Sequence, residues 1–167
     1  MELYQLIVNT FKEAVRSRLL SDRPIGCLLS GGLDSSLVAS VASHLLKEQG
    51  KSLKTFSIGM KEGTDIVYAR EVAEHIGSDH TEFIYEAEEG LKSLKEVIAV
   101  TETFDITTIR ASVGQYLLAK RISSETDAVV ILNGDGADEC QMGYLYFYLA
   151  PTSEEAKRDR DRLVQEI

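Results

Sequence analysis

Residues 25–36 of the chain read IGCLLSGGLDSS, and this stretch decides the fold. Its first five residues are an apolar run without alternation, which is typical of a short strand covered on both faces in a parallel sheet. The glycines that follow, Gly31 and Gly32, let the backbone turn sharply and approach a ligand closely. A helix is predicted directly after this loop, because apolar residues recur there at helical spacing (Val38, Val41, Ala42, Leu45).

The rest of the chain alternates between the same two kinds of segment. Apolar patterns predict further strands over residues 53–60, 80–85 and 128–132. Helical spacing of apolar residues predicts helices over residues 3–20, 65–76, 91–98, 108–122 and 153–167, with Asp65 as the cap of the second of these. This alternation predicts an α/β fold with a parallel sheet. Right-handed crossovers lead us to expect the strand order 3-2-1-4, with helices on both faces.

In this order the first and fourth strands are neighbours at the point where the winding reverses. Ligands bind at such switch points, outside the carboxyl ends of the strands. The loop after the fourth strand reads NGDGADE at residues 133–139, and it again joins glycines to carboxylates. We therefore expect Asp34 and Asp138 to face one another across the switch point.

The loop at residues 30–36 has the composition of a phosphate-binding loop. The start of the following helix offers unpaired N–H groups and a positive dipole end, and Ser30, Ser35 and Ser36 add hydroxyl donors. The loop lacks the GxxxxGK[ST] pattern of a Walker loop. Asp34 is explained if magnesium sits between it and the phosphates, because magnesium binds carboxylate and phosphate oxygens together.

Structural explanations compete with these functional ones. A Gly-Gly turn between a strand and a helix is common, and the acidic loop at residues 133–139 taken alone is equally consistent with an ordinary turn. That loop lacks the ligand spacing of a calcium-binding EF-hand. His80, near the start of a predicted strand, is expected to be structural and not part of the site.

Composition and charge exclude several classes of function. The formal charge is −9, from 27 acidic and 18 basic residues, so nucleic acid is not an expected partner. No apolar stretch approaches the ~20 residues that span a bilayer, and the N-terminus lacks a signal-peptide pattern. Cys27 and Cys140 have no CxxC spacing, which argues against a zinc site or a disulfide scaffold. A reduced, cytoplasmic protein is expected.

The motifs resemble a known family. SGGLDSS at 30–36 resembles the pyrophosphate-binding loop of N-type ATP pyrophosphatases. TFSIG at 55–59, ETFDITTIRAS at 102–112 and GDGADECQMGYLYFYLAP at 134–151 are similar to glutamine-dependent asparagine synthetase. This similarity runs from about residue 20 to residue 165, further than the motifs that all pyrophosphatases share.

The resemblance implies a fold, a reaction and partners. The fold would be an adenine-nucleotide α-hydrolase-like (Rossmann-like) sheet. The reaction would use ATP and Mg²⁺ to activate aspartate as β-aspartyl-AMP, which ammonia then converts to asparagine. In the family, a separate N-terminal glutaminase domain releases that ammonia from glutamine. Neither nucleic acid nor a membrane is implied as a partner.

The resemblance also assigns residues to roles. Those that would hold the pyrophosphate are Ser30, Gly31, Gly32, Asp34, Ser35 and Ser36. Asp34 and Asp138 would bind magnesium. The adenosine would lie against Leu29, Ile58, Asn133 and Gly134. Positions near the reacting centre would be Thr107, Thr108, Arg110 and Asp135, with Arg110 neutralising charge on the phosphate.

The chain departs from the family pattern in the acidic loop and in length. The family usually has GEGSDE where this chain has GDGADE at 134–139, so Asp135 is one methylene shorter and Ala137 lacks a hydroxyl. Asn133 stands where a serine is typical. We expect residues 1–167 to form a single, partial synthetase domain without the glutaminase domain or the C-terminal helical region.

Two alternatives stay open. The chain could be an N-type ATP pyrophosphatase of another specificity, such as a β-lactam synthetase, or a nucleotide-binding remnant without full catalysis. The charged helical tail at residues 153–167 is a candidate surface for self-association into a homo-oligomer.

Overall fold

The computed structural model describes residues 2–166, which fold into two compact units that divide between Asn133 and Gly134. Within these residues, no helix combines the length and the apolar character that crossing a bilayer requires.

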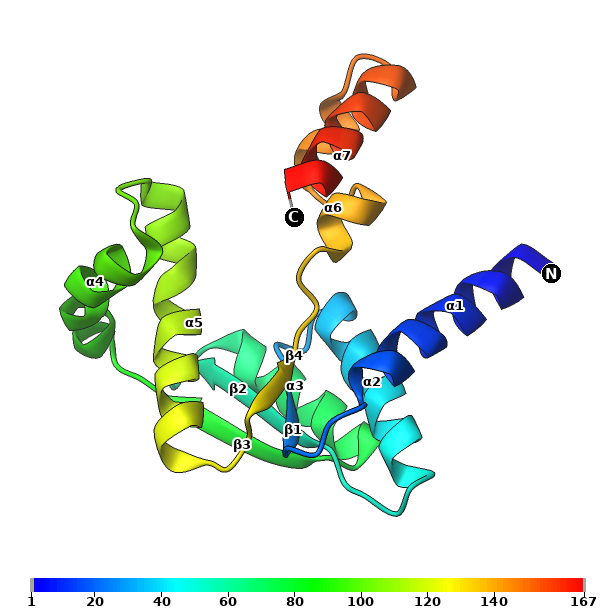
Figure 1. Ribbon diagram of the computed structural model, residues 1–167. Helices are drawn as coiled ribbons and strands as arrows, with labels where there is room; N and C mark the ends of the chain where they lie inside the picture. The colour runs from blue at the N-terminus through cyan, green and yellow to red at the C-terminus, as the bar shows by residue number, and fades with distance from the viewer. Residues whose placement is uncertain (1, 167) are drawn as a thin grey trace. The chain divides into compact units, whose positions relative to one another are not determined.

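The first unit contains a four-stranded sheet. Its strands are β1 (Ile25–Leu28), β2 (Lys54–Gly59), β3 (Asp79–Ile84) and β4 (Val130–Leu132). Its helices are α1 (Glu2–Arg18), α2 (Leu33–Lys47), α3 (Thr64–Ile76), α4 (Ala87–Thr101) and α5 (Ile106–Glu125). Every strand pairing is parallel and the order is β3-β2-β1-β4, which confirms the predicted 3-2-1-4 arrangement (Figure 1).

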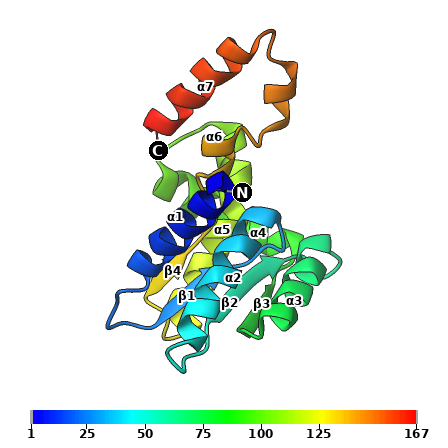
Figure 2. The same cartoon turned by 90° about the vertical axis from the view of Figure 1, so that its right-hand side faces the viewer.

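Helices cover both faces of this sheet because successive strand residues point in opposite directions. Cys27 and Leu29 face the larger core, which they share with α1, α2 and α3. Leu28 and Phe56 face the other core, which Leu118 of α5 helps to fill. The views in Figures 1 and 2 place α2 and α5 on opposite sides of the strands, so the predicted helices on both faces are confirmed.

The second unit holds three short elements. They are α6 (Ala137–Gln141), a 3₁₀ helix (Leu145–Leu149) and α7 (Ser153–Glu166). Only α7 was expected from the sequence. The sequence does not predict the two short helices, because neither is long enough to show a helical repeat of apolar residues.

One predicted helix cap is wrong. Gly63, and not Asp65, is the residue before α3, and it makes no side-chain capping bond. Asp65 lies in the first turn of α3, where a negative charge still favours the helix dipole. The αL residue Gly77 ends the helix, with its N–H bonded to carbonyls of the last turn.

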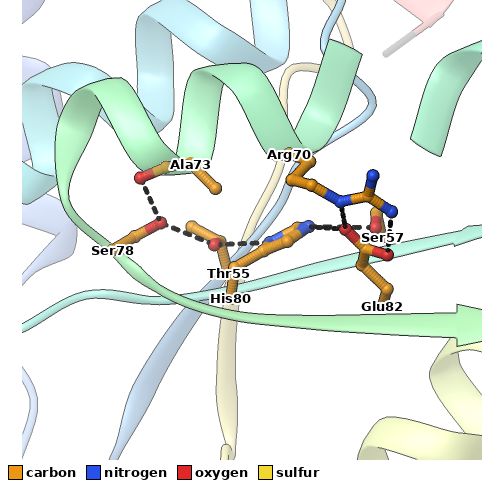
Figure 3. A network of polar contacts seen from close by, with 7 residues as sticks. All are labelled: Thr55, Ser57, Arg70, Ala73, Ser78, His80 and Glu82. Atoms are coloured by element: carbon orange, nitrogen blue, oxygen red, sulfur yellow. Dashed lines mark hydrogen bonds and ion pairs between the residues drawn. The ribbon is translucent and has the colours of Figure 1, made fainter. Parts of the chain in front are cut away.

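A network of polar side chains links β2, β3 and α3 (Figure 3). Nδ1 of His80 lies 2.8 Å from Oγ1 of Thr55, and Nε2 lies 3.2 Å from Oγ of Ser57. Thr55 and Ser57 are buried. Arg70 donates two hydrogen bonds, of 2.7 and 2.8 Å, to the carboxylate of Glu82. His80 is therefore a structural residue of the sheet, as expected.

Burial lowers the pKa of His80 below its ordinary value of 6.5, and it prevails over the charges nearby. The carboxylate of Glu82, 3.9 Å from Nε2, raises this pKa, and the guanidinium of Arg70 lowers it. The native state consequently binds a proton on His80 less readily than the unfolded chain does.

The free energy of unfolding should therefore decrease as the pH falls below about 6.5. Between pH 6.5 and the lowered pKa of the native state, His80 binds a proton in the unfolded chain but not in the folded protein. One proton gives a slope of at most about 1.4 kcal/mol per pH unit. Urea unfolding between pH 7.5 and 5 should show this slope in the wild type and a smaller one in His80→Gln. The control His75→Gln, at an exposed position of α3, should keep the wild-type decline; equal slopes in all three proteins would contradict the assignment.

The loop after β1 is pressed against α3 at Gly31. Gly31 has a φ of +83°, and a Cβ there would lie 2.5 Å from Cβ of Tyr68 and 2.7 Å from the backbone N of Ala69. Gly32 differs, because its φ is −68° and a Cβ would approach only Oγ of Ser30, at 3.3 Å. The two glycines of the motif therefore serve different purposes.

Gly31→Ala should destabilise the protein by about 2 kcal/mol or more, because it adds both left-handed backbone strain and a clash with α3. Gly32→Ala should change the free energy of unfolding by less than about 1 kcal/mol. Urea unfolding monitored by circular dichroism compares the two variants. Similar losses in both would show that α3 does not set the requirement for glycine.

Candidate functional site

The loop from Ser30 to Ser36 holds its shape through its own serines. Oγ of Ser30 lies 3.0 Å from Oγ of Ser35 and accepts the N–H of Gly32 at 3.3 Å. The Ser35 hydroxyl donates to the carbonyl of Gly32 and accepts the N–H of Ser30, each at 3.3 Å. The loop is thus closed on itself directly after β1, at the carboxyl end of a parallel strand.

The loop leads into the N-terminus of α2. Gly32, the residue before the helix, provides no side-chain cap, so the first-turn N–H groups keep the exposed character that suits an anion. Oγ of Ser36 is buried and has no hydrogen-bond partner among residues 2–166. A buried hydroxyl without a partner costs about 1–3 kcal/mol. A ligand oxygen held by this loop would supply the missing partner.

Asp34 and Asp138 each have the donor chemistry of a magnesium ligand. Asp34 is half-buried in the first turn of α2, and Asp138 is half-buried in the first turn of α6. Both offer the hard carboxylate oxygens that Mg²⁺ prefers. Across residues 2–166 there is no group of three or more His, Cys, Asp or Glu residues that could hold a metal ion. Magnesium sites commonly use one or two carboxylates together with substrate phosphates, so either carboxylate has suitable donor chemistry.

The two apolar residues assigned to adenosine lie on opposite faces of the sheet. Leu29 is 2% exposed and its side chain belongs to the core beneath α2, so a ligand can reach only its backbone. Ile58, near the end of β2, is partly buried on the α5 side. Both residues lie at the carboxyl edge of the sheet, which makes them candidates for contact with adenosine. Their side chains point to different cores, so they do not line a common pocket wall.

The acidic loop begins at the end of β4. Asn133 is the last residue of the first unit, and Gly134, Asp135 and Asp138 belong to the second. Gly136 has a φ of +89°, which turns the chain into α6. That Asp34 and Asp138 face one another stays a prediction.

Tyr144 is a member of this region that the sequence reasoning did not select. Its hydroxyl donates a hydrogen bond to Glu139, which raises the pKa of Tyr144 to about 12 and lowers that of Glu139. Glu139 is therefore held as a carboxylate beside Asp138. Nothing in the residue types of this segment indicates the contact between Tyr144 and Glu139.

The residues assigned to the reacting centre lie in the first turns of α5. Thr107 and Arg110 are exposed there. The backbone N–H and the hydroxyl of Thr108 both donate to Asp105, at 2.7 and 2.9 Å. These bonds lower the pKa of Asp105 and cap the helix. Thr108 thus has a structural role, which leaves Thr107 and Arg110 as the side chains available to a substrate.

Comparison with known proteins identifies relatives over most of the chain. The family model described as asparagine synthase matches residues 7–166. The glutamine-hydrolyzing asparagine synthetase of Gallus gallus is 54% identical over 159 residues, which are 94% of this chain and 28% of that protein. The human enzyme is 53% identical over the same shares. The chain therefore spans little more than a quarter of the length of these relatives.

A solved structure supports the fold class. The NH3-dependent NAD synthetase of Campylobacter jejuni superposes with a TM-score of 0.56 at 16% identity, and covers 98% of this chain and 77% of that one. At this identity the likeness concerns the fold, and it bears out the expected adenine-nucleotide α-hydrolase-like sheet. The family model extends across nearly all of the described residues, including both loops at the carboxyl ends of β1 and β4. The chain belongs to the asparagine synthase family.

Proposed function

We propose that this chain is the ATP-binding part of an enzyme that makes asparagine from aspartate, ATP and ammonia. The observation that carries the proposal is the closed serine loop at residues 30–36, with the unpaired, buried hydroxyl of Ser36 at the start of α2. Family membership adds the reaction class, because the relatives are glutamine-hydrolyzing asparagine synthetases.

The pyrophosphate part of ATP would lie in the loop. Ser30, Gly31, Gly32, Ser35 and Ser36 would offer hydroxyl and backbone N–H donors, and the dipole of α2 would favour the negative charge. Backbone atoms of Leu29 and Gly134, with Ile58 and Asn133, would hold the adenosine.

Mg²⁺ held by Asp34 and Asp138 would neutralise charge on the phosphates and on the leaving pyrophosphate. In the first step, an oxygen of the aspartate β-carboxylate attacks the α-phosphorus of ATP. The bond from this phosphorus to the oxygen bridging to the β-phosphate breaks, and pyrophosphate leaves. In the second step, ammonia attacks the activated carbonyl carbon, loses a proton, and AMP departs to give asparagine. The loop contributes mainly by orienting the reactants.

Arg110, Thr107 and Asp135 are proposed to surround the reacting centre, with Thr108 beside them holding the first turn of α5 through its bonds to Asp105. The guanidinium of Arg110 suits the negative charge on the α-phosphate, and Thr107 is free to donate to the same oxygens. Asp135 replaces the glutamate usual in the family, so its carboxylate reaches one methylene less far.

A second function is favoured by this replacement and by Ala137, which lacks the hydroxyl usual at its position. In this alternative the chain binds ATP but does not complete the reaction alone, and other parts of a longer protein supply ammonia and aspartate contacts. A glutaminase domain would be the source of ammonia in either case.

Calorimetry of ATP·Mg²⁺ binding separates these functions from a purely structural loop. Asp34→Asn should weaken binding by roughly 10- to 100-fold, because it removes one charged contact to the metal and phosphates. Asp65→Asn is the matched control, since Asp65 occupies the first turn of α3 outside the loop, and it should bind as the wild type does.

Aspartate and ammonia are then added, and AMP and pyrophosphate are measured. Formation of AMP only with aspartate supports asparagine synthesis, and binding without turnover supports the second function. Absence of ATP binding by the wild type would refute both.

A further inference from the structure

We propose that Gly143 is a positioning residue, which fixes the carboxylate of Asp138 in the place from which it binds the metal. The inference rests on the proposed function for the role of Asp138. Its geometry lies entirely within the second unit, and concerns how the chain turns after α6.

The chain folds back on Asp138 at the end of α6. Met142 has a left-handed φ of +57° and its N–H donates to the carbonyl of Asp138. The N–H of Gly143 donates to the same carbonyl at 3.0 Å. Two backbone bonds therefore bring the residues that follow the helix against Asp138, the acidic residue of α6 that is assigned to the metal.

The Asp138 carboxylate occupies the space that a side chain at residue 143 would need. A Cβ built on Gly143 would lie 1.9 Å from Oδ1 of Asp138, 2.9 Å from Cγ and 3.2 Å from Cα. Gly143 does not have a positive φ. The requirement for glycine at this position therefore comes from the carboxylate and not from the backbone conformation.

The neighbouring carboxylate is held in a different way. Glu139 accepts a hydrogen bond from the hydroxyl of Tyr144. For Asp138, residues 2–166 provide no side-chain hydrogen bond or ion pair to the carboxylate. Its position depends on the space that Gly143 leaves beside it by having no side chain, and its oxygens keep their capacity to bind a cation.

Met142 provides a matched control from the same turn. Its left-handed φ favours glycine, yet the chain has methionine there. Met142→Gly should relieve backbone strain and raise the Tm by roughly 2–4 °C, without altering cation binding. Gly143→Ala should do the opposite: it should displace the carboxylate and change the Tm little, since the Asp138 side chain can rotate.

The test uses the full chain with ATP and Mn²⁺, with bound Mn²⁺ counted by electron paramagnetic resonance and the Tm taken from circular dichroism. Gly143→Ala should weaken Mn²⁺ binding by about 10- to 100-fold, as expected when a ligand loses its support. Asp138→Asn calibrates the loss of the ligand itself. The double variant should bind no more weakly than Asp138→Asn alone, because Gly143 acts only through Asp138.

Each failure has its own pattern. If Asp138→Asn binds Mn²⁺ as the wild type does, the metal role of Asp138 is wrong and the inference falls with it. Weak binding by Asp138→Asn together with normal binding by Gly143→Ala would overturn the positioning role alone, as would a lower Tm with unchanged affinity. If Gly143→Ala is poorly folded, the same substitution in the Met142→Gly background restores the folded population for the measurement.

Discussion

The burial of β1 on both faces is the constraint on which the first unit depends. This strand lies between β2 and β4, and its side chains pack on both sides: Ile25 and Cys27 in the core beneath α2, and Leu28 in the core beneath α5. In a parallel sheet, ligands meet the chain at the carboxyl ends of the strands. The serine loop stands at that end, and its position follows from the packing of the strand below it.

Within the serine loop, some residues are needed for packing against the sheet layer and others are not. Gly31 is pressed against α3, and it serves the packing of the sheet layer. Gly32 and the serine hydroxyls are not needed for that packing: the hydroxyls of Ser30 and Ser35 close the loop, and the ligand-binding role of the loop is the one proposed above. Two adjacent glycines of one motif therefore differ in what they are needed for. The atoms that surround each position distinguish them.

The second unit relies on a different principle, because residues 134–166 contribute no side chain to either hydrophobic core. Its order comes from local contacts: the stacked rings of Tyr144, Tyr146 and Phe147, the bond from Tyr144 to Glu139, and the turn of Met142 and Gly143 onto Asp138. Such contacts join residues a few positions apart. They orient the acidic residues of α6 individually, which a sheet edge alone does not do.

The sequence by itself determined the α/β class, the strand order, the two loops at strand ends and the family, because apolar periodicity and motif letters carry that information directly. It misplaced the cap of α3, missed α6 and the 3₁₀ helix, and did not find the contact of Tyr144 with Glu139. These features depend on which atoms meet in space. Only the tertiary structure shows why glycine is required at residues 31 and 143. A side chain at Gly31 would collide with α3, and one at Gly143 would collide with Asp138, and neither neighbour can be read from the sequence.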